Sequence, residues 1–294
     1  MTEVQIKARA KINISLDITG KRPDGYHEIS TVMQTLALHD TLQIKKISKP
    51  DYLKVVSNLP WLPSDERNLA YRAAKYLKDR FAEHFTQDDG IFINIRKTIP
   101  ASAGLAGGSA DCAAALVGVR NLFRLPIDDD ELREVSVQFG ADVPFCMLRG
   151  CAYATGIGEV LQPLPPLPYM HIVLAKPPII VSTEDVFRAF NIENMGKRPD
   201  TERIIHGIHN RSLDDICGGM ANVLESVTAQ QYPIIQELKT FMMNHGATTT
   251  MMTGSGPTVF GIFAGRKAAE AATKALKRTY RDFNDIYMTR PISY

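Results

Sequence analysis

Cysteine is scarce in this chain of 294 residues, which has four: Cys112, Cys146, Cys151 and Cys217. They form no CxxC pair and are too scattered for a disulfide framework in a chain of this length, so a reducing compartment is expected. No leader pattern opens the sequence, and no apolar run approaches the ~20 residues that a membrane span needs. These absences predict a soluble cytoplasmic protein that does not enter a membrane.

Charge of one sign is not in excess either. The chain has 34 Lys and Arg against 32 Asp and Glu, a formal net charge of +2, and no block of like charge. A broad basic face that binds nucleic acid is therefore not indicated, and a small-molecule partner is expected instead. Apolar residues make up 45% of the chain, which is ample for two cores. We place the two domains at residues 1–160 and 161–294.

Strict alternation of residue type marks a strand from Lys11 to Thr19. Every second residue is Ile or Leu, and the residues between them include Lys11, Asn13, Ser15 and Asp17. Because successive side chains of a strand point to opposite faces, Lys11 and Asn13 share one polar face.

Periodicity and turn residues predict the remaining elements. Strands are expected at 29–38, 41–47, 91–95, 171–175, 248–253, 258–263 and near 286, with a strand or hairpin in 151–161. Helices are expected at 68–85, from 128 to about 140, and at 183–191, 220–229, 233–245 and 267–279. A turn is expected at 20–27 and a connector at 164–169. This mixture indicates an α+β fold.

The glycine-rich run KTIPASAGLAGGSAD, residues 97–111, follows a strand-like segment and leads into an alanine-rich helix. Gly107, Gly108 and Ser109 stand where that helix begins, so their backbone N–H groups have no partner within the helix and face its positive end. This context favours phosphate binding over a tightly packed turn. No Lys follows the glycines, so the segment is not a Walker-type phosphate-binding loop. No protein-kinase catalytic loop occurs in the sequence either.

Transfer of a phosphate held at such a loop needs a base for the acceptor hydroxyl. Asp142 is a lone carboxylate between apolar residues in FGADVPF, and Lys11 stands on the polar strand face. An aspartate before a Val-Pro step is more often a turn residue, and a lysine on a strand is often solvated. The residue pattern alone leaves both readings open.

Three segments, AKINISLDI, PASAGLAGGSAD and TGSGPTVF, resemble in order and spacing the signature motifs of the GHMP kinase superfamily. The segments RPDGYHE and GADVPF are similar to the branch of that family that acts on a cytidylylated polyol. The resemblance implies a two-domain α+β fold, with an N-terminal ribosomal-protein-S5-like α/β domain and a C-terminal ferredoxin-like domain. It also implies transfer of phosphate from ATP to the C2 hydroxyl of that polyol, in non-mevalonate isoprenoid biosynthesis.

The resemblance assigns roles to particular residues. Lys11 and Asp142 match the catalytic pair, with Asp142 as the base and also a substrate contact. The other substrate-binding positions match Asn13, Tyr26, His27, Thr183 and Phe187. The ATP-binding positions match Asn68, Leu69, Lys97, Pro100, Ala101, Ser102, Ala103, Gly104, Leu105, Ala106, Gly107, Gly108 and Ser109.

Several of these positions also have structural interpretations. Tyr26 can cover a core edge, Thr183 can cap a helix and Phe187 can pack on it. Asn68 can begin a helix, and Lys97 can be the solvated end of a strand.

Magnesium has no assigned ligand in this sequence. Ala110 stands where many relatives carry a second serine, and no counterpart is identified for the glutamate that holds magnesium in some members. We therefore expect Mg²⁺ to be held mainly by ATP phosphates and water. The TGSG motif at 253–256 is expected to close over the substrate side, or to be a tight turn only.

Three rival functions remain open at this point. The first is the same phosphate transfer to mevalonate or homoserine. The DGYH turn favours the cytidylylated polyol over these two acceptors. A ligand sensor without activity would be expected to lack Lys11 or Asp142, and both are present. An RNA-binding module is disfavoured by the near-neutral charge.

Overall fold

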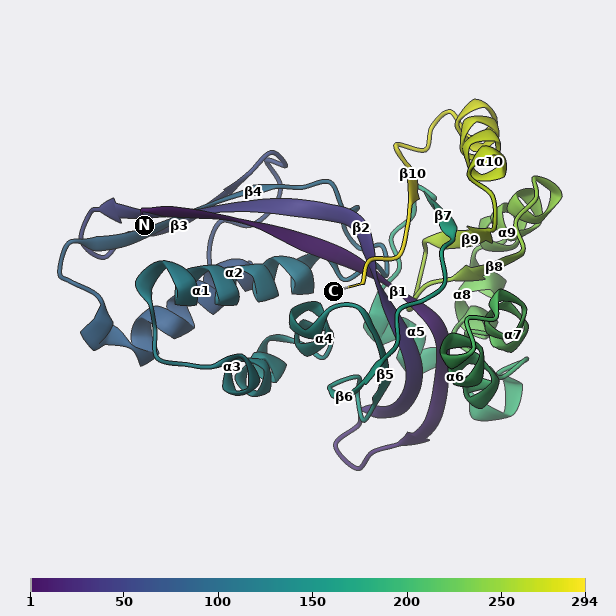
Figure 1. The fold of residues 1–294 in the computed structure, drawn as a ribbon, viewed down its shortest axis with the longest axis horizontal. Coiled ribbons are helices and arrows are strands. Elements are labelled where there is room, and N and C mark those ends of the chain that lie inside the picture. The colour runs from purple at the N-terminus through teal and green to yellow at the C-terminus, as the bar shows by residue number, and fades with distance from the viewer. Residues whose placement is uncertain (1, 294) are drawn as a thin grey trace. The chain divides into compact units, whose positions relative to one another are not determined.

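The computed structural model describes residues 2–293, and the chain divides into two compact units (Figure 1). The first unit comprises the residues up to 10 together with 38–101 and 106–148, and the second comprises 11–37, 102–105 and the residues from 149 onward. Two long strands, β1 (Glu3–Lys21) and β2 (His27–Ser48), contribute to both units. The middle of β1 and the start of β2, residues 11–37, group with the later part of the chain in the second unit.

In the first unit, β4 (Asp89–Arg96) pairs antiparallel with the second half of β2 and parallel with β3 (Leu53–Ser57). Helices α1 (Leu69–Arg80) and α2 (Gly107–Phe123) pack against each other, and α3 (Asp129–Ser136) and α4 (Val143–Leu148) follow. Short 3₁₀ turns lie at η1 (Ala82–His84) and η2 (Val137–Phe139).

In the core of the first unit, every second residue of the strands packs against small residues of the helices. Leu42, Ile44, Ile91, Ile93 and Ile95 are fully buried together with the alanines of α1 and α2. Alanine at these contacts lets the two helices approach closely, and this packing fixes the position at which α2 begins.

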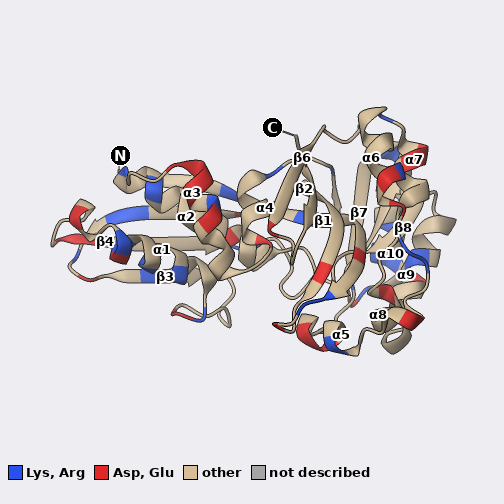
Figure 2. Ribbon diagram, turned by 90° about the horizontal axis from the view of Figure 1, so that it is seen from below, with Lys and Arg blue, Asp and Glu red and all other residues tan. Residues whose placement is uncertain are grey.

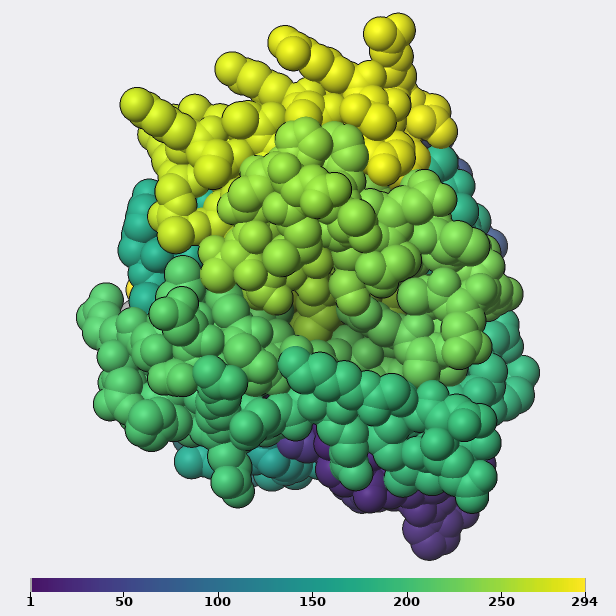
Figure 3. All heavy atoms as spheres, turned by 90° about the vertical axis from the view of Figure 1, so that its right-hand side faces the viewer, coloured from purple at the N-terminus to yellow at the C-terminus, as the bar shows by residue number. Residues whose placement is uncertain are grey.

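In the second unit, four strands form an antiparallel sheet in the order β10-β7-β9-β8. The strands are β7 (His171–Lys176), β8 (Thr249–Met252), β9 (Val259–Phe263) and β10 (Asp285–Thr289). Helix α9 (Ile234–Asn244) precedes β8, α10 (Arg266–Thr279) precedes β10, and both pack on this sheet. Figure 3 shows the atoms of α10 in yellow on this unit's surface. This βαββαβ order confirms the predicted ferredoxin-like C-terminal part.

The rest of the second unit surrounds the first half of β2. That half pairs antiparallel with β5 (Cys151–Thr155), which pairs with β6 (Val160–Leu164) as the predicted hairpin. The further helices are α5 (Thr183–Ala189), α6 (Thr201–His209), α7 (Leu213–Gly219) and α8 (Glu225–Gln231), with the 3₁₀ turn η3 (Ile192–Asn194).

Several predicted boundaries were wrong. Residues 29–38 and 41–47 belong to one continuous strand, β2. The helix expected at 68–85 ends at Arg80, although Phe81 and Phe85 continue to pack on the core, which explains the helical spacing of apolar residues. Helices α4, α6 and α7 were not predicted, because helices of six to nine residues present too few turns for a periodic pattern. Helix α8 begins at Glu225 rather than at 220.

Positions of basic and acidic residues are interspersed along the ribbon in Figure 2, and three acidic residues stand in the first turn of α3. Between residues 2 and 293, no helix combines the length and apolar character that crossing a membrane requires.

Candidate functional site

Helix α2 begins without a side-chain cap. Ala106 precedes its first residue in the left-handed conformation (φ 56°, ψ 33°), and the first turn contains no acidic residue. The first intrahelical bond runs from Ala110 N to Ala106 O at 2.8 Å, so the N–H groups of Gly107, Gly108 and Ser109 lie before it. A 17-residue helix whose first turn is uncapped in this way presents the positive end of its dipole to an anion.

The loop that leads into α2 alternates in backbone conformation. Ser102, Gly104 and Ala106 have φ values of 48°, 71° and 56°, whereas Ala103 and Leu105 are not among the residues with positive φ. Positive φ at every second residue turns the backbone sharply at each of these positions before α2 begins. The phosphate-binding role of this segment stays a prediction.

Lys97 lies directly beside the start of α2. A Cβ added to Gly107 would stand 3.3 Å from Lys97 Nζ, so glycine leaves the ammonium and the helix start in close contact. The Lys97 side chain is 5% exposed and lies between two buried carboxylates, at 2.5 Å from Asp40 Oδ2 and 2.7 Å from Asp111 Oδ2. Lys97 is therefore not the solvated end of a strand.

Asp40 also holds the chain that approaches the loop. Its Oδ1 accepts backbone hydrogen bonds from Thr98 N at 2.5 Å and from Ile99 N at 2.8 Å. One carboxylate thus fixes the ammonium of Lys97 and the two following backbone amides.

The second carboxylate, Asp111, is less well compensated. Its Oδ1 is buried and has no hydrogen-bond partner among residues 2–293. Burial raises the pKa of Asp111 to about 7, opposed by Lys97 and reinforced by the neighbouring Asp40 carboxylate. For Lys97, burial alone would lower the pKa, but Asp111 and Asp40 together outweigh it and the pKa is raised. The ammonium therefore stays charged at neutral pH.

Asn68 and Leu69 stand at the start of α1. Asn68 caps this helix, since its Oδ1 accepts from Ala70 N at 2.9 Å, and its Nδ2 donates to Pro63 O at 2.8 Å. Leu69 is half-buried, and its Cδ1 lies 3.8 Å from the position of a Cβ on Gly108. The beginnings of α1 and α2 are therefore neighbours.

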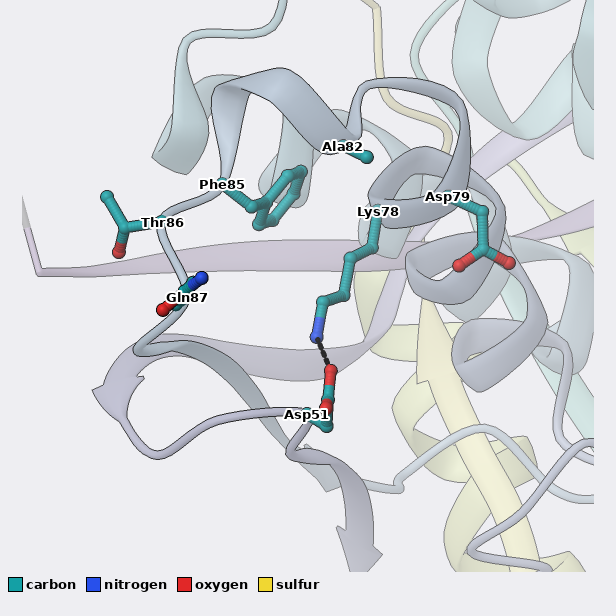
Figure 4. A pocket seen from close by; sticks show the side chains of 7 residues that line it. All are labelled: Asp51, Lys78, Asp79, Ala82, Phe85, Thr86 and Gln87. Atoms are coloured by element: carbon teal, nitrogen blue, oxygen red, sulfur yellow. Dashed lines mark ion pairs between the residues drawn. The ribbon is translucent and has the colours of Figure 1, made fainter.

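A hollow of about 400 Å³ lies at the other end of α1 (Figure 4). Lys78 and Asp51 point toward each other there, with 3.7 Å between Nζ and Oδ1. Because Lys78 belongs to the last turn of α1 and Asn68 precedes its first, this hollow is separate from the start of α2.

In the second unit, the polar face predicted for β1 is buried rather than solvated. Lys11 is 5% exposed, and its Nζ donates to Asn13 Oδ1 at 2.9 Å. Asn13 Nδ2 donates to Thr31 Oγ1 at 2.8 Å, and Asn13 N donates to Thr253 Oγ1 at 3.1 Å. These contacts hold the Asn13 amide so that its oxygen faces the lysine.

Gly104 and Leu105 of the glycine loop are hydrogen-bonded to Thr253 and Lys11. Lys11 N donates to Leu105 O at 3.1 Å, and Thr253 Oγ1 donates to Gly104 O at 3.3 Å. A Cβ on Gly104 would stand 2.3 Å from Thr253 O, so no larger residue fits against the TGSG turn. The third motif is therefore a turn that supports the loop and Asn13.

Asn222 and Thr228 brace the TGSG turn, and neither was predicted. Asn222 Nδ2 donates to Met252 O and to Gly254 O, each at 2.8 Å, and Thr228 Oγ1 donates to Ser255 O at 3.1 Å. Asn222 follows no motif, and only its burial and contacts identify it.

Two of the predicted substrate contacts, His27 and Phe187, join the start of β2 to α5. The rings of His27 and Phe187 are 5.5 Å apart at 41°, and Tyr26 is 60% exposed. Ser182, not Thr183, caps α5, and the Thr183 hydroxyl instead lies 2.8 Å from Ser255 Oγ. The capping interpretation of Thr183 is therefore wrong. Burial, followed by the charge of Lys21, lowers the pKa of His27, so its ring is neutral at neutral pH.

Asp142 lies in the first unit, immediately before α4. It is half-buried, and its backbone carbonyl accepts from Cys146 N at 3.1 Å. The aspartate thus stands where the chain enters a short helix, a position that a turn residue or a site residue can occupy.

Each unit therefore gathers a subset of the predicted residues. The first brings Leu69 and Lys97 to the start of α2, and the second joins Lys11, Asn13 and Gly104 through Thr253. Sequence reasoning missed five supporting residues of common types: Thr31, Asp40, Asp111, Asn222 and Thr228. In the described part of the chain, no group of three or more His, Cys, Asp and Glu side chains could hold a metal ion.

Comparison with known proteins gives matches along nearly the whole chain. Residues 68–150 match the model of the GHMP kinases N terminal domain, and residues 204–282 match that of the GHMP kinases C terminal. The chain is 46% identical over 272 residues to a 4-diphosphocytidyl-2-C-methyl-D-erythritol kinase of Caldicellulosiruptor saccharolyticus, covering 92% of both chains. It is 43% identical over 289 residues to the protein of that name from Clostridium botulinum, covering 98% of this chain and 100% of the relative.

Solved structures agree with these matches. A crystal structure of 4-(cytidine 5'-diphospho)-2C-methyl-D-erythritol kinase has a TM-score of 0.82 at 31% identity and covers 99% of this chain and 100% of its own. A homoserine kinase from Cytophaga hutchinsonii, at 17% identity and a TM-score of 0.77 over 98% and 95%, shares the fold. The predicted two-domain kinase fold is confirmed, and the chain belongs to the GHMP kinase family.

Proposed function

We propose that this protein is an ATP-dependent kinase that phosphorylates the C2 hydroxyl of 4-diphosphocytidyl-2-C-methyl-D-erythritol, giving the 2-phosphate and ADP in non-mevalonate isoprenoid biosynthesis. The observation that carries the proposal is the buried Lys11 ammonium, which donates to Asn13 Oδ1 at 2.9 Å. The backbone N–H of the same lysine donates to Leu105 O of the glycine loop. Relatives that are 43–46% identical over almost their full length, and named for this substrate, support it.

On the donor side, the N–H groups of Gly107, Gly108 and Ser109 would bind the phosphates of ATP. The close approach of Gly107 to Lys97 adds a fixed positive charge at the same helix end. Asp40 keeps this ammonium in place and holds the backbone of Thr98 and Ile99. Because these hydrogen bonds fix the ammonium and the backbone beside it, little reorganisation would accompany nucleotide binding.

On the acceptor side, Asp142 would accept the proton of the C2 hydroxyl as its oxygen attacks the γ-phosphorus and the bond to the ADP oxygen breaks. The Lys11 ammonium would offset the negative charge that develops on the attacking oxygen. Asn13, fixed by Thr31 and Thr253, would orient the lysine and the alcohol. Transfer would be direct, with no covalent enzyme intermediate.

The cytidylyl group would lie between Tyr26, His27 and Phe187. The exposed Tyr26 ring and the neighbouring rings of His27 and Phe187 offer aromatic faces to a base. A neutral His27 keeps one ring nitrogen as donor and the other as acceptor, which suits the edge of a pyrimidine.

Magnesium would reach the site on the nucleotide. The described residues contain no cluster of acidic or imidazole ligands for it, and Mg²⁺ commonly keeps several waters while bound to substrate phosphates. The ion would neutralise phosphate charge, and the loop offers one hydroxyl in the first turn of α2, that of Ser109.

The proposal is tested by ADP release with 4-diphosphocytidyl-2-C-methyl-D-erythritol, mevalonate and homoserine as acceptors. We expect turnover with the first only. Asp142→Asn should lose at least about a hundredfold in kcat while binding ATP normally. Asp88→Asn, an exposed aspartate on a loop, serves as the matched control and should keep wild-type rates. Turnover of mevalonate or homoserine instead would show that the proposed substrate is wrong. A fully active Asp142→Asn enzyme would show that Asp142 is not the catalytic base.

A further inference from the structure

Trp61 is the only tryptophan of the chain, and it is 63% exposed. It lies in the connection between β3 and α1, in the sequence PWLP. A large aromatic side chain left in water gives up the favourable burial that such rings obtain in a core. Exposed aromatic anchors on ordered backbone are characteristic of binding surfaces.

One end of this connection is bonded to Lys97. Asn58 Oδ1 accepts from Lys97 N at 2.6 Å, and Asn58 Nδ2 donates to Lys97 O at 3.2 Å. The backbone of the residue whose ammonium touches the start of α2 is thus held by the same connection that carries Trp61.

The other end is bonded to the start of α1. Pro63 O accepts from Asn68 Nδ2 at 2.8 Å, and Leu69, the next residue, lies beside Gly108. Because consecutive Cα atoms are 3.8 Å apart, the Cα of Trp61 lies within about 7.6 Å of that of Pro63 and about 11.4 Å of that of Asn58.

The backbone that carries Trp61 has little freedom. Pro60 and Pro63 fix their φ angles on either side of it, and Leu62 N donates to Leu59 O at 3.0 Å. The backbone at Trp61 is therefore held within a short connection whose two ends are bonded to Lys97 and to the residue before Leu69.

We propose that Trp61 contacts the purine ring of the nucleotide bound at the start of α2 and makes this site prefer a purine donor over a pyrimidine one. This inference rests on the proposed function. The acceptor itself carries a cytidine diphosphate, so a donor site that took pyrimidines equally well would be inhibited by the acceptor. A two-ring indole overlaps more of a purine than of a pyrimidine, and stacking strengthens with overlap.

The first test is tryptophan fluorescence of the full chain titrated with ATP and with CTP. Since the chain has one tryptophan, any change in indole emission belongs to Trp61. Emission should change with ATP and saturate at the Kd that calorimetry gives, and CTP should need about tenfold higher concentrations.

The second test is the ratio of kcat/KM for ATP to that for CTP. Trp61→Ala should raise the KM for ATP about tenfold and lower the ratio by a similar factor, with the KM for the acceptor unchanged. Trp61→Phe should restore most of the loss. Tyr169→Ala, which removes another exposed ring, in the second unit, should leave the ratio at its wild-type value.

ATP binding in calorimetry with unchanged indole emission would overturn the inference and leave the proposed function intact. A wild-type ratio for Trp61→Ala would do the same. Failure of the wild-type protein to bind ATP at all would overturn the proposed function and this inference together.

Discussion

Replacement of Gly104 by alanine tests the close contact between the glycine loop and the TGSG turn in the second unit. Gly104 has a φ of +71°, and a Cβ there would lie 2.3 Å from Thr253 O and 3.2 Å from Gly256 O. The left-handed conformation costs an L-residue about 1–2 kcal/mol. The contact with backbone carbonyls adds about 1–3 kcal/mol, because neither carbonyl can rotate away as a side chain would. We expect Gly104→Ala to lower the free energy of unfolding by about 2–5 kcal/mol.

Gly196 supplies the matched control. It also has a φ of +71°, and a Cβ there would meet nothing within 4 Å. Gly196→Ala therefore carries the conformational cost alone, about 1–2 kcal/mol. Urea unfolding followed by circular dichroism measures both variants, and the difference between them isolates the contact with Thr253.

Activity should report the same displacement. Thr253 Oγ1 accepts from Asn13 N, so a shift of Thr253 moves the amide that holds Lys11. A displacement of about 1 Å should lower kcat of Gly104→Ala by up to about a hundredfold while Gly196→Ala keeps the wild-type value. If the two variants unfold within about 0.5 kcal/mol of each other and turn over equally, the reasoning about this contact is wrong.

Two further predictions concern the buried charges of the first unit. Asp40→Ala removes the acceptor of Lys97, Thr98 N and Ile99 N and should destabilise the protein by about 3–5 kcal/mol in urea unfolding. Asp79→Ala, which breaks an exposed pair with Lys75, should leave the free energy of unfolding nearly unchanged. Equal losses would refute the role of Asp40. Because the folded-state pKa of Asp111 is raised to about 7, above its unfolded value of about 3.9, its contribution to stability should be largest below pH 4 and should fall as the pH rises from about 4 to about 7. Asp111→Asn should lack this loss, so its stability relative to wild type should improve as the pH rises from about 4 to about 7, and a constant difference would contradict the raised pKa.

Local pattern was sufficient to predict the strands and the longer helices. The alternation from Lys11 to Thr19 lies inside β1, and the order of elements after residue 170 is that of the ferredoxin-like sheet. The continuity of β2 and the short helices α4, α6 and α7 could not be predicted in the same way. Their lengths are set by tertiary packing, which a local period does not contain.

The site was predicted by motif and completed only by contacts distant in sequence. The polar face of Lys11 and Asn13 follows from alternation, but its burial does not, because Thr253 lies 240 residues from Asn13. Lys97 is separated by 57 residues from Asp40 and by 14 from Asp111. Aspartate and asparagine are common residues, so no local signal marked Asp40 or Asn222 as supports of the site.

The most direct test of the account is ³¹P NMR of the product formed from ATP and 4-diphosphocytidyl-2-C-methyl-D-erythritol. C2 of this acceptor carries a methyl group and no hydrogen, so a phosphate ester there has no proton on its ester carbon to split the phosphorus signal. The account predicts a new phosphomonoester singlet in the proton-coupled spectrum, equal in amount to the ADP formed and missing with Asp142→Asn. A monoester signal split by protons on its ester carbon, or ADP formed without a new monoester, would contradict it.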